Sequence, residues 1–261
     1  MRLMPFVAAL VAVAACKRVE PGTRVDTRVV DYDAGGAALQ GYLYWDADAK
    51  TPRPGILVVH EWWGDDEHAQ HQARRAAEAG YVALALDMFG KGKVTTHPQD
   101  AQAFATEATK DPAVMMARFN AGLEQLKRDP HVDSAHIAAI GYCFGGMVVL
   151  SMAKSGAPLD AVGSFHGAIP EGPVDSGKVR ARVLIMTGGA DPFVPADKVE
   201  AFRKALAGAG ARVEVITYPG AKHGFTNPQA GTHGMDQLAY DAPADSSSWD
   251  SLLKMLKDVW H

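Results

Sequence analysis

The sequence predicts a single α/β domain with a doubly wound, mostly parallel sheet and an N-terminal β-hairpin. Apolar runs of strand length alternate with helix-like segments along most of the chain, as expected when helical crossovers connect parallel strands. Several of these runs are apolar at every position, which is typical of strands buried on both faces. No internal repeat or low-complexity linker divides the 261 residues. Single α/β domains often reach this size.

The first two strands are predicted at residues 27–32 and 38–45, flanking an Asp-Ala-Gly-Gly turn that favours a hairpin. The remaining strands are predicted from apolar runs at residues 55–60, 81–86, 137–142, 161–165, 183–187 and 213–218. Each of these six runs is followed by a turn signal or a helix-like segment. We therefore expect them to form the parallel part of the sheet.

The helices are predicted from their end signals and apolar spacing, at residues 67–79, 98–108, 112–127, 144–154, 196–207 and 247–259. Gly80 ends the first of them, and prolines open the second and third. In the third helix, Met115, Phe119 and Leu123 share one face. His68 and His71 lie three residues apart in the first helix, and we interpret them as a solvated polar helix start rather than a metal site.

The composition is that of a globular protein, with 48% hydrophobic and 21% charged residues. The net charge is −4 and no basic stripe is present, so we expect no nucleic-acid partner. The two cysteines, Cys16 and Cys143, cannot build a disulfide framework. Since no CxxC pair occurs, the sequence gives no sign of a zinc or thiol-redox motif, and we expect no metal.

Residues 1–15 have the features of a signal peptide: one arginine, a short apolar stretch and small residues at its end. The apolar stretch is shorter than the ~20 residues that span a bilayer. The tetrad Val-Ala-Ala-Cys at 13–16 resembles the bacterial lipobox, in which the cysteine is lipidated after export. Acyl chains on Cys16 would then anchor the protein, with residues 16–23 as a tether and 24–261 as the soluble domain.

Two alternatives to the lipid anchor stay open: an ordinary secretory signal with an incidental cysteine, and a misassigned start codon with a cytoplasmic product. Lys17 follows the cysteine, which resembles the pattern that directs Gram-negative lipoproteins to the outer membrane. We therefore expect a lipid-anchored protein of the cell envelope or periplasm, at the outer membrane of a Gram-negative bacterium, with the leaflet that holds the anchor left open. Lipidation of Cys16 would leave Cys143 as the one free thiol.

A catalytic nucleophile is predicted at Cys143, in the sequence Gly-Tyr-Cys-Phe-Gly-Gly between a strand and a helix. This is the G-x-S-x-G nucleophile elbow of α/β-hydrolases with cysteine in place of serine. The tight turn strains the backbone of the nucleophile and brings neighbouring chain close to Gly141 and Gly145, where a Cβ atom would clash. The start of the following helix also favours a thiolate through its dipole.

An elbow of this kind predicts an acid and then a histidine, each in a loop after a later strand. Asp191 follows the strand at 183–187, and His223 follows the strand at 213–218. Asp191 is therefore the candidate that orients the imidazole of His223, the candidate base. In the alternative interpretation, Asp191 caps the helix at 196–207 and His223 only lines a loop.

Four motifs resemble the dienelactone hydrolase family: the elbow at 141–146, Gly-Gly-Ala-Asp-Pro-Phe-Val-Pro at 188–195, Lys-His-Gly-Phe at 222–225 and His-Glu-Trp-Trp-Gly at 60–64. The match runs from about residue 55 to the C-terminus. The resemblance implies a hydrolase of carboxylic esters or lactones, with carboxymethylenebutenolidase-type activity within its range. It also implies a Cys–His–Asp triad and neither a metal nor an organic cofactor.

The resemblance assigns further roles to three residues. Glu61 matches the family's additional carboxylate, which contacts the nucleophile in the resting enzyme and helps to activate it. The backbone N–H groups of Trp62 and Phe144 match the oxyanion hole, which donates to the charge that develops on the attacked carbonyl.

For substrate binding, the family's dienelactone enzymes hold a substrate carboxylate with two arginines. Here Lys91 and Asn227 stand where we align those arginines. Lysine cannot form the bidentate fork and asparagine carries no charge, so an anionic dienelactone is not the favoured substrate. Trp63 and Phe89 are predicted pocket walls, although core positions are an equal alternative, and His166 borders the cleft or simply ends a strand.

The leading prediction is thus a monomeric hydrolase of small-molecule esters or lactones that works through an acyl-enzyme on Cys143. Thioesters belong to the same reaction class. Two rival functions stay open at this point: a non-catalytic ligand-binding envelope lipoprotein, and a cysteine acyltransferase or thioesterase.

Overall fold

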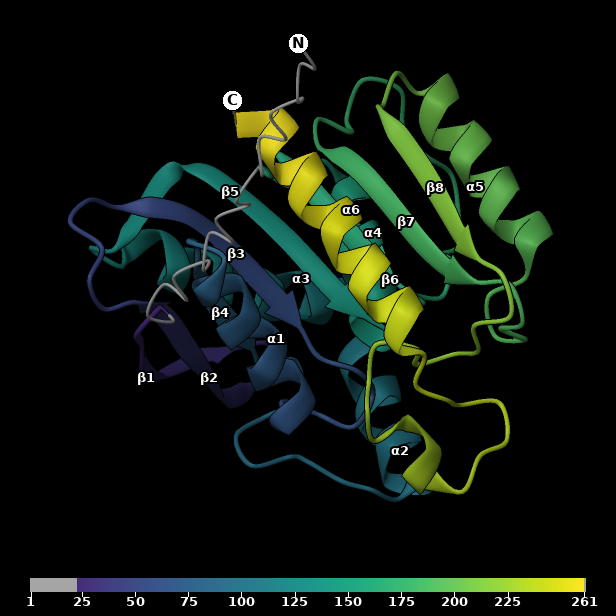
Figure 1. Cartoon of the computed structure of the whole chain (residues 1–261), viewed down its shortest axis with the longest axis horizontal. Helices are drawn as coiled ribbons and strands as arrows, with labels where there is room; N and C mark the ends of the chain where they lie inside the picture. The colour runs from purple at the N-terminus through teal and green to yellow at the C-terminus, as the bar shows by residue number, and fades with distance from the viewer. Residues whose placement is uncertain (1–22, 261) are drawn as a thin grey trace, which may run out of the picture.

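The computed structural model describes residues 23–260. The predicted signal peptide, Cys16 and most of the predicted tether lie outside the described residues. Eight strands form one sheet (Figure 1). They are β1 (Val25–Ala34), β2 (Ala37–Asp46), β3 (Arg53–Val59), β4 (Val82–Leu86), β5 (Val132–Tyr142), β6 (Ala161–Phe165), β7 (Arg182–Gly188) and β8 (Val213–Tyr218).

The strand order is β1-β2-β4-β3-β5-β6-β7-β8. β2 pairs antiparallel with both β1 and β4, and all other neighbours are parallel. The β1–β2 turn places Gly35 at φ +57° and Gly36 at φ +75°. Two consecutive positive φ angles are those of the type I′ hairpin turn, whose twist matches the flanking strands. The predicted N-terminal hairpin and the mostly parallel sheet are confirmed.

Six α-helices and one 3₁₀ turn connect the strands in the described part of the chain. They are α1 (Glu67–Glu78), α2 (Pro98–Thr109), α3 (Pro112–Arg128), α4 (Phe144–Ser155), α5 (Ala196–Gly208), η1 (Ala230–His233) and α6 (Ala242–Trp260). α1 and α6 pack on one face of the sheet, whereas α3, α4 and α5 pack on the other. In Figure 1, α1 and α6 lie in front of the strands and α3 and α4 lie behind them.

Burial on both faces explains the uninterrupted apolar runs. In β3, Ile56 and Val58 pack with α1 and α6, while Leu57 and Val59 pack with α3 and α4, and all four are fully buried. Each such side chain stabilises the fold by about 1.5–3 kcal/mol relative to an exposed one. A polar residue at any of these positions would face a helix on one side of the sheet or the other.

Two elements begin earlier than their apolar patterns predict. β5 starts at Val132, where it pairs with Arg53, and its register shifts between Pro54 and Gly55. The first half of β5 is polar, so an apolar-run criterion misses it. α6 starts at Ala242, because the side chain of Asp241 accepts a hydrogen bond from the Ala244 N–H (3.0 Å) and so caps the helix.

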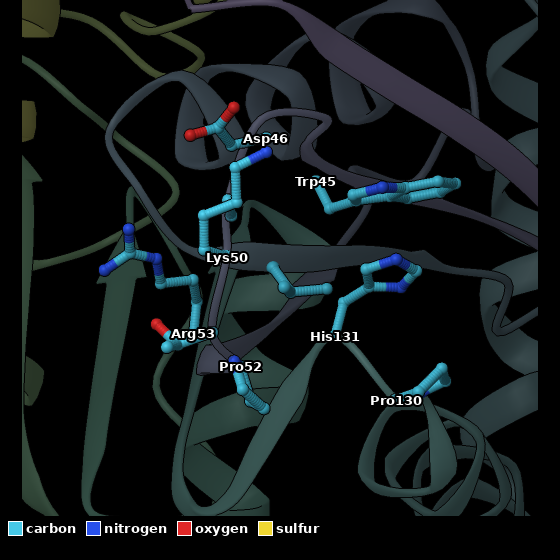
Figure 2. A pocket seen from close by; sticks show the side chains of 10 residues that line it. Trp45, Asp46, Lys50, Pro52, Arg53, Pro130 and His131 are labelled. Atoms are coloured by element: carbon cyan, nitrogen blue, oxygen red, sulfur yellow. The ribbon is translucent and has the colours of Figure 1, made fainter.

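A small cavity of about 120 Å³ lies where β3, β4 and β5 begin (Figure 2). Trp45 stacks on His131 there, with ring centroids 4.7 Å apart. The walls of this cavity contain Lys50 and Arg53 but neither Cys143 nor His223. Among residues 23–260, no helix is both long and apolar enough to cross a bilayer. The predicted chemistry lies at the opposite edge of the sheet, where the parallel strands end.

Candidate active site

Cys143 occupies a strained turn between β5 and α4, with φ +51° and ψ −111°. Non-glycine residues rarely adopt positive φ, and they do so mainly where the surrounding structure enforces it. A Cβ atom on Gly141 would lie 2.1 Å from the Gly145 carbonyl oxygen, and one on Gly145 would lie 2.2 Å from the Val59 carbonyl oxygen. Both contacts are closer than real Cβ atoms approach, so the turn needs glycine at both positions, as the sequence argument requires.

His223 and Asp191 lie together at the ends of β8 and β7. The Nδ1 of His223 is 2.8 Å from the Oδ2 of Asp191, whose side chain is fully buried. The second carboxylate oxygen of Asp191 accepts the Phe193 N–H at 2.8 Å. Pro195, rather than Asp191, precedes the first turn of α5, and no side chain caps that helix. The alternative interpretation of Asp191 as a helix cap is therefore wrong.

The charge state of His223 depends on its two partners. Burial alone would lower its pKa, but the Cys143 side chain and the hydrogen bond to Asp191 outweigh burial and raise the pKa to about 10. At neutral pH the imidazole of His223 therefore carries its second proton. A protonated histidine beside a cysteine is the arrangement of Cys–His nucleophile pairs.

Cys143 and His223 open into a cavity of about 450 Å³. Its walls are mainly apolar, and none of them is a lysine or arginine among the described residues. The lining residues are Trp62, Gln102, Ala105, Thr106, Thr109, Cys143, Phe144, Met147, Ala168, Phe193, His223, Met235 and Leu238. A nucleophile and a base at the wall of an apolar cavity can act on an uncharged acyl group.

The backbone donors expected for an oxyanion hole flank this cavity. Phe144 is the first residue of α4, where amide groups have no partner within the helix. Trp62 follows β3 and lines the same cavity. Within residues 23–260, neither amide N–H donates a hydrogen bond to another group. Both could therefore donate to a substrate oxygen.

Glu61 is buried, and its carboxylate accepts a hydrogen bond from the Asn227 side chain at 2.6 Å. The expected resting contact between Glu61 and the nucleophile is not among the hydrogen bonds of the described chain. Burial, together with the charge of Asp66, raises the pKa of Glu61 to about 7, although Asn227 and His223 oppose this shift. Asn227 is thus the hydrogen-bond partner of Glu61. The prediction that Asn227 binds substrate is corrected accordingly.

Three other predicted substrate-binding residues lie outside the cavity walls. The Lys91 ammonium is 2.9 Å from an Asp31 oxygen on β1, and both side chains are more than half exposed. Trp63 is buried and stacks on His233, with ring centroids 3.9 Å apart. Phe89 is fully buried against His60 and other aromatic rings. Trp63 and Phe89 are core aromatics, and Lys91 forms a surface ion pair.

The last of the predicted substrate-binding residues, His166, is fully buried behind Cys143 and does not line the cavity. His68 is also buried rather than solvated, which corrects its interpretation as part of a polar helix start. The part of the chain that the structure describes holds no group of three or more histidine, cysteine or acidic side chains placed to bind a metal.

Sequence reasoning missed most of the cavity wall. Met147 lies one helical turn beyond Cys143, and Phe193 lies two residues beyond Asp191, so proximity to the motifs could have found both. Gln102, Thr106 and Thr109 come from α2, far from any motif in the sequence. Their place at the cavity follows from long-range packing, for which the sequence carries no local signal.

The buried carboxylate of Glu61 gives a test by stability. Its pKa in the folded protein is about 7, above the usual 4.5, so the folded state binds more protons between these values. The free energy of unfolding should therefore fall as pH rises through this window, by about 3 kcal/mol at most. Since Glu61→Gln removes this dependence, the variant should gain stability relative to wild type between pH 5 and pH 8 in urea denaturation.

Glu67→Gln, at an exposed position on α1, is the matched control. Its free energy of unfolding should differ from that of the wild type by the same amount at pH 5 and at pH 8. If the Glu61→Gln difference were also independent of pH, Glu61 would not titrate near neutrality.

Comparison with known proteins assigns the chain to a family. The family model described as "Dienelactone hydrolase family" matches residues 39–260. A structure of a dienelactone hydrolase-like promiscuous phosphotriesterase from metagenomic libraries is 36% identical, with a TM-score of 0.86, and the match covers 90% of this chain and 98% of that one.

Two curated proteins are also similar to this chain in sequence. A Methylorubrum extorquens protein, provisionally named a carboxymethylenebutenolidase, is 30% identical over 212 residues, covering 77% of this chain and 70% of that protein. Protein usf of Aquifex pyrophilus is 26% identical over 236 residues, covering 88% and 98% respectively. With a family match over more than four fifths of its length, the chain belongs to the dienelactone hydrolase family of carboxylic ester hydrolases.

Proposed function

We propose that the protein hydrolyses uncharged carboxylic esters or lactones through a covalent acyl-enzyme on Cys143. The observation that carries this proposal is that Cys143 and His223 line an apolar cavity, with His223 bonded to the buried Asp191. Membership of an ester-hydrolase family supports the reaction class. The identity of the nucleophile and the covalent step are our inferences from the geometry.

In the first half of the proposed reaction, the Cys143 thiolate attacks the substrate carbonyl and forms a tetrahedral intermediate. The N–H groups of Trp62 and Phe144 stabilise its oxyanion. When the carbon–oxygen bond to the leaving group breaks, His223 gives its proton to the departing alkoxide, which leaves as the alcohol. The product on the enzyme is a thioester of Cys143.

In the second half, neutral His223 takes a proton from water, and the resulting hydroxide adds to the thioester carbonyl. Collapse of the second tetrahedral intermediate breaks the carbon–sulfur bond and releases the carboxylic acid. The thiolate and the imidazolium are thereby restored. Asp191 keeps the imidazole oriented and stabilises its cation throughout.

The cavity wall favours uncharged substrates. Among the described residues, its only titratable side chains are Cys143 and His223, and none of those lining residues is a lysine or arginine that could bind a substrate carboxylate. A neutral phosphotriester is a second candidate substrate, because it shares the lack of charge. The 36% identical metagenomic relative is described as a promiscuous phosphotriesterase.

The nucleophile is tested with Cys143→Ala. We expect hydrolysis of p-nitrophenyl butyrate to fall by at least about a thousandfold, because the residual site keeps only binding and the oxyanion donors. Denaturation during turnover followed by mass spectrometry should find a butyryl group on Cys143 in the wild type. Lys91→Ala, a change outside the cavity, is the control and should keep full activity.

Retained turnover in Cys143→Ala would refute the nucleophile. A wild type that binds esters without hydrolysing them would favour the non-catalytic ligand-binding lipoprotein. Product that shifts from acid to a new ester when an alcohol acceptor is added would favour the acyltransferase.

The preference for uncharged substrates is tested with matched aryl esters. The kcat/KM for p-nitrophenyl butyrate should exceed that for the anionic p-nitrophenyl hemisuccinate by about tenfold or more, because burying an unpaired carboxylate costs well over 1.4 kcal/mol. Ethyl paraoxon tests the phosphotriester. Equal kcat/KM values for the two aryl esters would contradict the assignment of an uncharged acyl group.

We also propose that lipid on Cys16 anchors the protein to the outer membrane of a Gram-negative cell. The support is the resemblance of residues 13–16 to a lipobox and the lysine at position 17. Acyl chains contribute about 0.8 kcal/mol of membrane binding for each buried methylene, so a multiply acylated cysteine anchors stably.

For the full-length chain, Cys16→Ala should move the protein from the membrane fraction to the soluble fraction of Gram-negative cells. The measurement is fractionation with detergent extraction, and Cys143→Ala serves as the matched cysteine control that stays with the membrane. Unchanged fractionation of Cys16→Ala would remove the lipid anchor.

A further inference from the structure

His166 is a fully buried residue with an uncommon backbone, immediately after β6. Its φ is +41°, and besides Cys143 it is the only non-glycine residue with positive φ in the described chain. Its own N–H donates to the Met186 carbonyl on β7 at 2.8 Å. The side chain of His166 extends toward the turn that carries Cys143 and the loop that carries His223.

Hydrogen bonds assign the protonation of the His166 ring. The Cys143 N–H donates to Nδ1 of His166 (3.1 Å), and also to the Phe165 carbonyl (3.0 Å). Since Nδ1 accepts, the proton of the neutral ring lies on Nε2, which donates to the Thr226 hydroxyl at 2.8 Å. Burial, with the charges of His223 and His68, lowers the pKa of His166 well below its usual value.

The Thr226 hydroxyl continues the chain. It lies 3.5 Å from Nε2 of His68 on α1, and Thr226 is itself buried. Thr226 stands three residues after His223 in the same loop. The His166 ring also meets the His223 ring edge-on, with centroids 5.1 Å apart. One buried side chain thus connects the backbone of the candidate nucleophile to the loop of the candidate base.

We propose that His166 and Thr226 are positioning residues, which fix the Cys143 turn relative to the His223 loop through the bonds Cys143 N–H to His166 and His166 to Thr226. This inference rests on the proposed roles of Cys143 and His223. Neither positioning residue lines the substrate cavity, so their loss should slow the chemistry without weakening substrate binding. Misplacement of a reacting group by about 1 Å costs enzymes about a hundredfold in rate.

Thr226→Val tests the inference, because it keeps the shape of the side chain and leaves the His166 Nε2–H without a partner. We expect kcat for p-nitrophenyl butyrate to fall about tenfold with KM within about twofold, in line with the loss of one buried hydrogen bond. Alkylation of Cys143 by iodoacetamide at pH 7, which needs no substrate turnover, should slow by a similar factor. Thr226→Ser restores the hydroxyl and should recover both rates to within about twofold.

Thr187→Val is the matched control. Thr187 is buried and its hydroxyl pairs with that of Thr217 at 3.2 Å, so this variant also loses a buried hydroxyl bond. It should keep the wild-type kcat and alkylation rate. If Thr226→Val kept both rates, or if Thr226→Ser were as slow as Thr226→Val, the positioning role would be refuted.

A second variant separates the two bonds of His166. Asparagine tolerates positive φ, and its side-chain oxygen can accept the Cys143 N–H, but it is too short to reach Thr226. His166→Asn should therefore match Thr226→Val, and combining the two changes should add little. Fully additive losses would overturn the proposed connection. If the wild type failed to hydrolyse esters, the proposed function would fall while alkylation of Cys143 still decided the positioning role.

Discussion

The site depends on a steric constraint, the close approach of three backbone segments around Cys143. The carbonyl of Val59 at the end of β3, Gly141 at the end of β5 and Gly145 in α4 meet within distances that leave no room for a Cβ atom. This contact bends the chain so that Cys143 takes a positive φ and its side chain reaches the cavity. The strain is supported by the large buried sheet around it, because local strain persists only where its surroundings enforce it.

The two buried carboxylates near the site, Asp191 and Glu61, differ in their electrostatic surroundings. Asp191 is bonded to His223, and the partners of that imidazole, Cys143 and Asp191, overcome burial and hold it in its charged form. Glu61 accepts a hydrogen bond from the neutral amide of Asn227, but burial outweighs this bond and the charge of His223, so the pKa of Glu61 rises toward neutrality. Burial thus makes Glu61 a proton-binding group near neutral pH, whereas Asp191 is the hydrogen-bond partner of His223.

The sequence was sufficient where function depends on local pattern. The order of Cys143, Asp191 and His223, each after a buried strand, predicted side chains that the parallel sheet brings to one edge. It was insufficient for Lys91, Trp63 and Phe89, because alignment with a family motif fixes a position in the chain but not the direction of a side chain. The Lys91 side chain forms an ion pair with Asp31 at the surface, and the Trp63 and Phe89 side chains pack against other aromatic rings in the core.

The division between strands and connecting segments explains how chemistry and substrate choice can vary independently. Cys143 and His166 follow directly on β5 and β6, so the hydrogen-bonded register of these strands fixes their relative positions, whereas Asp191 and His223 lie three and five residues beyond the ends of β7 and β8. The cavity wall combines residues of α2 and of the segment between β8 and α6 with residues that lie near strand ends, such as Trp62, Phe144 and Phe193. Substitutions on α2, which carries neither Cys143 nor His223, can therefore reshape the cavity without changing the segments that hold these two side chains.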